Sequence, residues 1–534
     1  MDIDKKKPNF LEGLVLKSRK AQEKLIYLSN TEINNIILKI SKEALKPANN
    51  TFLSKLAVEE TSFGNQKDKT KKNFYKTNNL LNELLKVVTL QPINNKTKNI
   101  ITILKPIGVI CGVTPSTNPI ATSLNYILNS IKCRNSIILC PNLRSYRTVN
   151  ELVNLIKKIL KKNKKPVDLV SLCPREILRS DLIINLFNLC DKNIVTGSQV
   201  MINRVKKSIK PYLVFGKGNA PIIIDQNINI QKTVMSIIES KSFDHSTSCS
   251  ADSVLIIHRK IYNNFIKELS KSGTYILNKD EKKKLDAIYF KKGIINTEII
   301  GKNATQILKL INIQNNEKKI IAYSLDMNQK NHFILGEKIT PILAIVESLN
   351  LDTSIKFANS VLKIAGKGHS AGIYSKNKKN ILDCATMLPV SRIIVNQPHS
   401  KSAGGSENNF LNTTLSLGCG PWGENNLSDN LSYKEFCNES KVVFKKKRTF
   451  KNLFTYENVN KVNNSKKQKD IIKIVKNILN EKINLNSNQA NCKNWDSMSY
   501  FSILSSLEKE FKIKISQKNF NKFDSIKNIL KIVK

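Results

Sequence analysis

A cysteine among small hydroxyl residues is the position in this chain best suited to covalent chemistry. Cys249 lies in the stretch 246–250, which is otherwise Ser and Thr, and an apolar strand-like run follows at 254–257. A thiol becomes a nucleophile when its thiolate is accessible and stabilised, and it is inert when packed as a small apolar group. Free cysteines are usually packing residues, so this stretch alone leaves both interpretations open.

Three turns of small residues could hold the partners of such a thiol. Asn118 joins a strand-like segment to a helical one, where its amide could donate to a developing oxyanion. Thr196-Gly197-Ser198 precedes a helical segment, so a cofactor phosphate could approach the helix N-terminus. Gly216-Lys217-Gly218 is another turn that permits close approach. Each pattern alone suits any α/β fold, and Asn-Pro is also ordinary turn chemistry.

Strand-like and helical segments alternate from about residue 100, and they must position these turns. The candidate strands are 101–104, 109–113, 136–140, 167–170, 193–196 and 220–224, and the helices between them include 145–161 and 198–208. This alternation predicts a parallel sheet with helices on both faces. Earlier helices are expected at 11–28, 31–45 and 74–88, and a second α/β region at 241–430.

The composition changes near the C-terminal end. Residues 445–469 are rich in Lys and Asn and are predicted to form a solvated linker. Apolar residues then recur every three or four positions through 470–534, which predicts a compact all-helical unit.

The charge and the cysteines limit the class of protein. The formal net charge is +45, from 87 Lys+Arg against 42 Asp+Glu, and such a charge permits nucleic-acid binding. However, the lysines are spread evenly along the chain and form no basic motif, as expected from an AT-rich genome. No specific nucleic-acid partner, membrane span or secretory signal is expected. Ten cysteines without C-x-x-C spacing argue against a metal site and disulfides, and they suit a cytoplasmic location.

In this order and spacing, the motifs resemble the aldehyde dehydrogenase superfamily over about residues 10–445. The resemblance is to its acylating, coenzyme-A-dependent branch, including the aldehyde dehydrogenase half of bifunctional alcohol/aldehyde dehydrogenases. Further anchors are the segments 55–60, 218–225, 336–341, 366–370, 392–396 and 416–423. The resemblance implies an N-terminal and Rossmann-type NAD(P)-binding domain at 1–240, an α/β catalytic domain with an oligomerisation element at 241–444, and a homo-oligomer.

The resemblance also implies catalytic roles. Cys249 would attack the carbonyl and carry the acyl group as a thioester, and the Asn118 amide would stabilise the oxyanion. His369 matches a histidine of the acylating branch that serves acid/base work or thiol positioning, with a purely structural histidine as the alternative. Hydrolytic members carry a glutamate base where this chain has Phe215, so the thioester should wait for a thiol.

Cofactor contacts follow from the same resemblance. Thr196, Gly197, Ser198, Gly216 and Gly218 would approach NAD or NADP. Glu337 matches a position that contacts the cofactor ribose, and the alternative is a plain surface glutamate. Arg144 could favour a 2′-phosphate, but the choice between NAD and NADP stays open.

The helical unit resembles an acyl carrier protein. Asp496-Ser497-Met498 is similar to the Asp-Ser-Leu motif whose serine bears 4′-phosphopantetheine, and Leu507-Glu-Lys-Glu-Phe-Lys-Ile513 agrees with it. The implied unit is a four-helix carrier domain at 470–534 served by a phosphopantetheinyl transferase. An ordinary helix cap at Asp496 or Ser497 is the alternative. Unlike the usual acidic carriers, the unit has 12 Lys against six Asp+Glu.

We therefore expect an oxidoreductase that interconverts an acyl thioester, on CoA or on a carrier, and an aldehyde with NAD(P)H. One alternative is the oxidative, catabolic direction. The other is a non-catalytic scaffold that presents the carrier. The acyl chain is left open.

Overall fold

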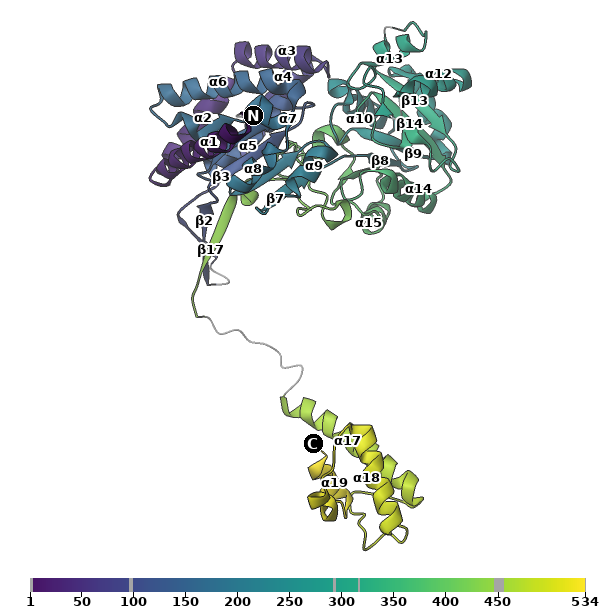
Figure 1. Ribbon diagram of the computed structural model, residues 1–534. Helices are drawn as coiled ribbons and strands as arrows, with labels where there is room; N and C mark the ends of the chain where they lie inside the picture. The colour runs from purple at the N-terminus through teal and green to yellow at the C-terminus, as the bar shows by residue number, and fades with distance from the viewer. Residues whose placement is uncertain (1–2, 96–98, 292–293, 316, 446–455, 534) are drawn as a thin grey trace. The chain divides into compact units, whose positions relative to one another are not determined.

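The computed structural model describes residues 3–95, 99–291, 294–315, 317–445 and 456–533 (Figure 1). The chain forms two compact units, 1–444 and 445–534. The larger unit contains two parallel sheets covered by helices, a three-stranded antiparallel sheet and a two-stranded antiparallel one.

The first parallel sheet has five strands in the order β5-β4-β3-β6-β7. Its strands are β3 (Val109–Thr114), β4 (Ser136–Pro141), β5 (Val170–Leu172), β6 (Lys192–Thr196) and β7 (Tyr212–Phe215). The helices of this half are α1 (Ile3–Ile26), α2 (Asn30–Ala44), α3 (Pro47–Thr61), α4 (Gln66–Leu84), α5 (Pro119–Lys132), α6 (Tyr146–Lys162), α7 (Arg175–Arg179), α8 (Leu182–Leu189) and α9 (Gln199–Val205). Short 3-10 helices lie at η1 (Leu143–Ser145) and η2 (Val167–Leu169).

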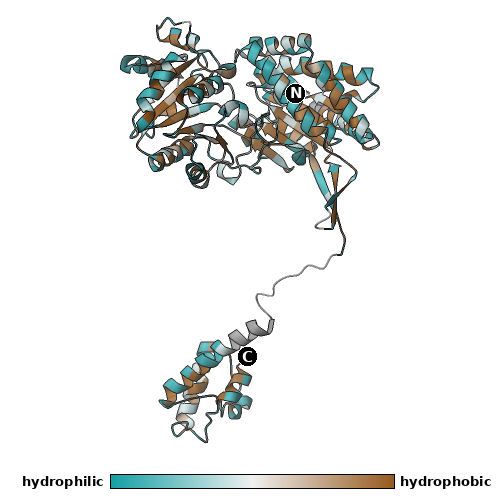
Figure 2. Cartoon of the chain, turned by 180° about the vertical axis from the view of Figure 1, so that it is seen from behind, coloured by the Kyte–Doolittle hydropathy of each residue, from teal (hydrophilic) through white to brown (hydrophobic). Residues whose placement is uncertain are grey.

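Alternate residues of these strands pack on opposite faces. In β3, Ile110 belongs to the core formed with α2, α5 and α6, whereas Val109 and Cys111 face the core formed with α1 and α8. Both faces are therefore buried, and this explains why the strands are continuous apolar runs (Figure 2).

The second parallel sheet has seven strands in the order β10-β13-β14-β9-β8-β15-β16. Its strands are β8 (Ala220–Ile224), β9 (Asp252–His258), β10 (Thr274–Ile276), β13 (Ile320–Leu325), β14 (Ile342–Ser348), β15 (Ala371–Tyr374) and β16 (Ile393–Val395). Its helices are α10 (Ile230–Ser242), α11 (Tyr262–Lys271), α12 (Lys279–Tyr289), α13 (Ala304–Leu310), α14 (Leu351–Ile364), α15 (Lys378–Met387) and α16 (His399–Ser402). The remaining short elements are β11 (Phe290–Lys291), β12 (Ile294–Ile295), η3 (Phe243–Ser246), η4 (Arg259–Ile261), η5 (Phe333–Leu335), η6 (Pro421–Gly423) and η7 (Tyr433–Phe436).

The antiparallel sheet joins distant parts of the chain. It consists of β1 (Pro92–Asn95), β2 (Ile100–Pro106) and β17 (Cys437–Val443), with β2 in the middle. The expected strand at 101–104 therefore exists, but it pairs antiparallel with β1 and β17 and is not part of a parallel sheet.

Other sequence predictions need correction at their boundaries. The strand at 220–224 pairs with β9 and β15 of the second sheet, so the two parallel sheets divide between residues 215 and 220 and not at 240. Residues 167–169 form a 3-10 turn before β5. Helix α3 was not expected, and α4 begins at Gln66, eight residues before the predicted start at 74.

The smaller unit is helical. It contains α17 (Tyr456–Leu479), α18 (Ser497–Phe511), η8 (Gln517–Lys522) and α19 (Ile526–Ile532), so one of the four expected helices is a 3-10 segment. Its core includes Val475, Trp495 and Leu507. Residues 456–469, predicted as linker, are the start of α17, while 446–455 lie outside the described residues. Across the described chain, no helix has the length and apolar character to cross a membrane.

Candidate active site

Cys249 lies between η3 and β9 and borders a cavity of about 410 Å³. Its side chain is partly exposed, whereas the nine other cysteines are buried. Cys111, Cys140, Cys190 and Cys384, for example, are core residues. Cys249 is the accessible thiol of the chain.

His369 contacts this thiol directly. Its Nε2 lies 3.3 Å from Cys249 Sγ, and its Nδ1 lies 2.8 Å from Ser370 Oγ. Burial, with Arg392 nearby, lowers the pKa of the His369 imidazole to about 3. Burial and the neighbouring Glu337 raise the pKa of the Cys249 thiol to about 12. Without ligands, the pair is therefore a protonated thiol beside a neutral imidazole.

Asn118 lines the same cavity from the start of α5. Its side chain makes no capping bond to the helix. Instead, Lys72 of α4 donates from Nζ to Asn118 Oδ1 at 2.7 Å. The amide nitrogen makes a long contact of 3.4 Å to Thr117 Oγ1, which leaves a second N–H to donate elsewhere. The structure therefore brings Cys249, His369 and Asn118 together around one thiol and its cavity.

The segment that leads into Cys249 is held by a buried ionic cluster. Asp244 is fully buried and accepts hydrogen bonds at Oδ2 from Lys72 at 2.6 Å and Lys69 at 3.0 Å. Burial alone would raise the pKa of the Asp244 carboxyl, but the two lysines outweigh it and lower the pKa to about 2. Residues 244–246 all have positive φ, between 49° and 63°, although none is glycine. This backbone is strained, and the cluster holds it in place.

The turn at 216–219 presses against the backbone of Cys249. A Cβ placed on Gly218 would lie 1.9 Å from the Cys249 carbonyl oxygen, so only glycine fits there. The Gly218 N–H donates to Glu337 Oε1 at 2.9 Å, and burial raises the pKa of the Glu337 carboxyl to about 7. Gly216 is exposed, and its nearest neighbour atom is 3.9 Å from such a Cβ.

The predicted phosphate turn leaves room for a cofactor. Ser198 precedes α9, and its side chain makes no capping bond. A Cβ on Gly197 would find its nearest atom at 3.7 Å, so the backbone there is approachable. Thr196 Oγ1 lies 2.7 Å from both Tyr126 Oη and Ser416 Oγ, which fixes the end of β6. These residues fit an NAD(P) phosphate group and ribose.

Two further residues near the site, Phe215 and His245, have structural partners. Phe215 ends β7 and is 2% exposed in the core of the first sheet, so it is an apolar packing group. His245 Nδ1 lies 3.1 Å from the Gly301 carbonyl oxygen, and thus its ring is held by the backbone and not by Cys249.

Sequence reasoning missed the lysines of α4. Lys69, Lys72 and Lys76 line up on the helix face toward Asp244 and the cavity. Their spacing of three and four is that of one helical face, so this pattern could have been read from the sequence.

Comparison with known proteins agrees with this geometry. Residues 11–410 match the model of the aldehyde dehydrogenase family. The chain belongs to the aldehyde dehydrogenase family. As an aldehyde dehydrogenase it is an oxidoreductase, which confirms that prediction.

Several relatives cover most of this aldehyde dehydrogenase. It is 30% identical to the acylating sulfoacetaldehyde dehydrogenase of Cupriavidus necator, over 81% of this chain and 88% of the relative. The aldehyde-alcohol dehydrogenase of Clostridium acetobutylicum is 30% identical over 80% of this chain, which spans 50% of that longer protein.

Two solved structures share the fold. The acetylating aldehyde dehydrogenase of Geobacillus thermoglucosidasius has a TM-score of 0.79 and 29% identity, over 84% of this chain and 99% of that one. The propionaldehyde dehydrogenase of Rhodopseudomonas palustris with bound propionyl-CoA has a TM-score of 0.72 and 25% identity, over 81% and 94%. The predicted resemblance to the acylating branch and to half of a bifunctional enzyme is confirmed.

Proposed function

We propose that this aldehyde dehydrogenase interconverts an acyl thioester and an aldehyde through a thioester on Cys249. The observation that carries the proposal is one accessible thiol, 3.3 Å from His369 Nε2, in a cavity shared with Asn118. The acylating relatives support the same chemistry.

The reaction can be followed through the chain's own residues. The Cys249 sulfur attacks the aldehyde carbon, its proton leaves toward His369 Nε2, and the Asn118 amide and the Cys249 N–H donate to the oxygen that becomes negative. NAD(P)⁺, held by Thr196–Ser198 and Glu337, would accept hydride from that carbon. The proton on His369 passes to solvent. The thiol of CoA then attacks the acyl carbon as the Cys249 sulfur leaves, and the proton of the CoA thiol returns to that sulfur through His369 Nε2. In reverse, the same steps reduce an acyl thioester to an aldehyde.

The absence of a carboxylate base at Phe215 favours a thiol over water as the acceptor of the acyl group. Phe215 supplies no carboxylate at the position where hydrolytic members activate water, so the acyl group should persist on Cys249 until a thiol arrives. Mass spectrometry after a single turnover tests this. An aldehyde with NAD⁺ or NADP⁺ should leave a stable acyl adduct on Cys249, and added CoA should remove it.

Matched variants give the control. Cys249→Ser should abolish the adduct and the thioester-dependent oxidation of NAD(P)H, whereas Cys384→Ala in the core should retain both. Full activity in Cys249→Ser would refute the role of Cys249 as nucleophile, and a wild-type chain without activity would support the scaffold alternative. Running the assay with each nucleotide and in both directions settles NAD against NADP and oxidation against reduction.

The smaller unit is proposed as an acyl carrier. Ser497 is the first residue of α18 and is exposed, beside Met498 and Phe501, which are 79% and 57% exposed. Asp496 caps the helix by accepting from Ser499 N at 2.8 Å, so within the described residues the Ser497 hydroxyl is not needed as the cap. A phosphopantetheine arm at Ser497 would carry an acyl thioester on the same chain as Cys249, which raises its effective concentration.

Intact mass after co-expression with a broad phosphopantetheinyl transferase tests the carrier. An addition of about 340 Da is expected on the wild-type chain and on Ser505→Ala, an exposed serine of the same helix, but not on Ser497→Ala. Failure to gain mass would refute the carrier and leave a dehydrogenase that uses free CoA.

The antiparallel sheet is proposed as the oligomer contact. Ile93, Val442 and Val443 expose 42%, 43% and 69% of their surface on its strands β1 and β17. Exposed apolar strands of this kind are normally covered by a partner. Sedimentation should find a dimer or larger assembly, and Val442→Lys with Val443→Lys should shift it toward the monomer.

A further inference from the structure

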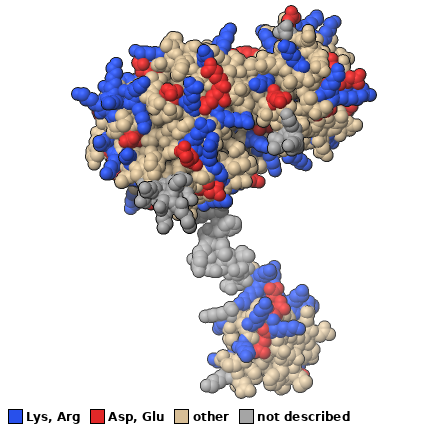
Figure 3. Space-filling view, turned by 45° about the horizontal axis from the view of Figure 1, so that its top comes forward, with Lys and Arg blue, Asp and Glu red and all other residues tan. Residues whose placement is uncertain are grey.

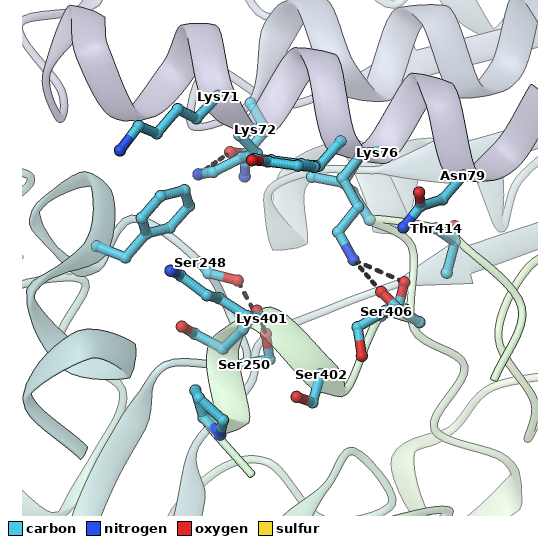
Figure 4. Close-up of a pocket in the computed structure, with 18 of the residues that line it drawn as sticks. Lys71, Lys72, Lys76, Asn79, Ser248, Ser250, Lys401, Ser402, Ser406 and Thr414 are labelled. Atoms are coloured by element: carbon cyan, nitrogen blue, oxygen red, sulfur yellow. Dashed lines mark hydrogen bonds between the residues drawn. The ribbon is translucent and has the colours of Figure 1, made fainter. Parts of the chain in front are cut away.

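The cavity beside Cys249 is lined by lysines from two directions. Lys71, Lys72 and Lys76 come from α4, and Lys401 comes from α16 on the opposite wall. Figure 4 shows Lys76 pointing from the helix into the cavity, with Ser402, Ser406 and Thr414 nearby. Surface lysines are numerous throughout this chain (Figure 3), but these side chains face a catalytic cavity.

Some of this positive charge is neutralised by carboxylates. Lys401 pairs with Glu239 at 2.5 Å. Lys69 and Lys72 both pair with the single carboxylate of Asp244, and Asp68, which accepts from the Asp244 N–H at 2.9 Å, also acts on Lys69.

Lys76 has no ion pair in the described part of the chain. Its Nζ donates to the carbonyl oxygens of Gly404 at 2.8 Å and Gly405 at 2.6 Å, which satisfies its hydrogen bonds but not its charge. Glu83, whose negative charge acts on Lys76, accepts hydrogen bonds from the Thr413 N–H at 3.0 Å and from the Thr413 hydroxyl. Burial, reinforced by Lys72, lowers the pKa of the Lys76 ammonium group to about 8.

An unpaired ammonium group in a partly desolvated wall is costly unless an anion joins it. The charged residues of the described cavity lining are four lysines against two glutamates, Glu239 and Glu407, so its formal charge is +2. The cavity, at about 410 Å³, lies at the small end of ligand pockets and holds the reacting thiol as part of its lining. Cys249 and Lys76 therefore line the same small cavity.

We propose that the acyl group handled at Cys249 is short and carries a second, anionic group, a carboxylate or a sulfonate, which pairs with Lys76. The inference rests on the proposed function and adds the substrate class. Lys76 is then the specificity-determining residue, and Lys72 adds a second positive charge on the same wall.

A phosphate of CoA is the other anion that could enter. The cavity lining does not include Thr196, Gly216, Gly218 or Glu337 among its described residues, so the cofactor turns face a different side of Cys249. This favours the acyl group as the occupant of the lysine-lined side.

Two aldehydes of equal length test the proposal on the full chain. With CoA and NAD(P)⁺ in excess, succinate semialdehyde should show a kcat/KM at least tenfold above that of butanal. Lys76→Met should reduce this ratio at least tenfold, and Lys76→Arg should restore most of it. Lys67→Met removes the same charge from an exposed position of α4 and should leave the ratio within twofold.

The possible outcomes distinguish failure of the proposed substrate class from failure of the proposed function. Turnover of both aldehydes without preference for the anionic one would overturn the substrate class and leave the proposed function intact. A rise in the KM for CoA in Lys76→Met, with the aldehyde ratio unchanged, would assign the lysine to a CoA phosphate and also overturn it. No CoA-dependent turnover of either aldehyde by the wild type would refute the proposed function itself. Should Lys76→Met fail to fold, the wild-type preference decides alone.

Discussion

Lys72 donates to the amide oxygen of Asn118 at 2.7 Å and so fixes which end of that amide is free to donate. The same ammonium group lies 2.6 Å from Asp244 Oδ2, five residues before Cys249. One lysine therefore ties the oxyanion donor to the segment that carries the nucleophile. A flipped amide would present an oxygen to the developing negative charge, and it would repel what it should stabilise.

Removing the Asn118 amide, which donates to the oxyanion, should lower kcat more than it weakens substrate binding. Asn118→Ala is expected to lower kcat by about a hundredfold to a thousandfold, the usual effect of losing one oxyanion donor. Lys72→Met should lower kcat by about ten- to a hundredfold, because the amide is then free to misorient. Single-turnover acylation of Cys249 measures both, with Lys67→Met as the control. Wild-type acylation in Lys72→Met would show that Asn118 needs no such partner.

The resting thiol should be poorly reactive at neutral pH. Because burial and Glu337 raise the pKa of Cys249 to about 12, the thiolate is a small fraction below that value. The rate of Cys249 alkylation by iodoacetamide should thus rise about tenfold per pH unit between pH 7 and 9.5, without a plateau. Cys249→Ser provides the background from other cysteines. A plateau near pH 8 would mean that the ligand-free site already stabilises the thiolate.

Two glycines of one turn should respond differently to alanine. At Gly218 the new methyl would meet the Cys249 carbonyl oxygen at 1.9 Å, so the backbone of the nucleophile must shift. Gly218→Ala should therefore lower kcat at least a hundredfold and cost about 1–3 kcal/mol of stability. Gly216→Ala places its methyl in open space and should change kcat less than threefold. Thermal unfolding and steady-state rates check both, and equal effects would contradict the close approach.

The sequence predicted those residues whose type is required by the chemistry. It was less successful for elements whose position depends on tertiary packing. Cys249, Asn118 and His369 could be found because their neighbours carry motifs, and the strands of the first sheet because they are apolar runs. Helix α3 was missed because its buried face includes Asn50 and Ser54, which hide the apolar period.

Tertiary contacts explain the other features that the sequence did not predict. Positive φ at Asp244, His245 and Ser246 has no local signal such as glycine, since it is imposed by Lys69 and Lys72 from a helix about 175 residues away. The placement of β8 in the second sheet likewise depends on pairing with β9 and β15, which no local pattern reveals.

The Asp244 cluster should make part of the stability depend on pH. The pKa of the Asp244 carboxyl is lowered to about 2 in the folded chain, because Lys72 and Lys69 outweigh burial. In the unfolded chain the pKa of this carboxyl is about 3.9. The stabilisation, about 2 kcal/mol, is therefore present above pH 4 and is lost as pH falls from 4 through 2.

Asp244→Asn tests this dependence. It leaves two buried ammonium groups unpaired and should cost about 3–5 kcal/mol at pH 7, and its unfolding should depend less on pH between 4 and 2. Asp280→Asn, at a carboxylate with 82% exposure on α12, should change neither quantity by more than about 0.5 kcal/mol. Denaturant unfolding followed across this pH range gives both values. If Asp244→Asn lost stability on acidification as steeply as the wild type does, the carboxylate would not be the group that binds the proton.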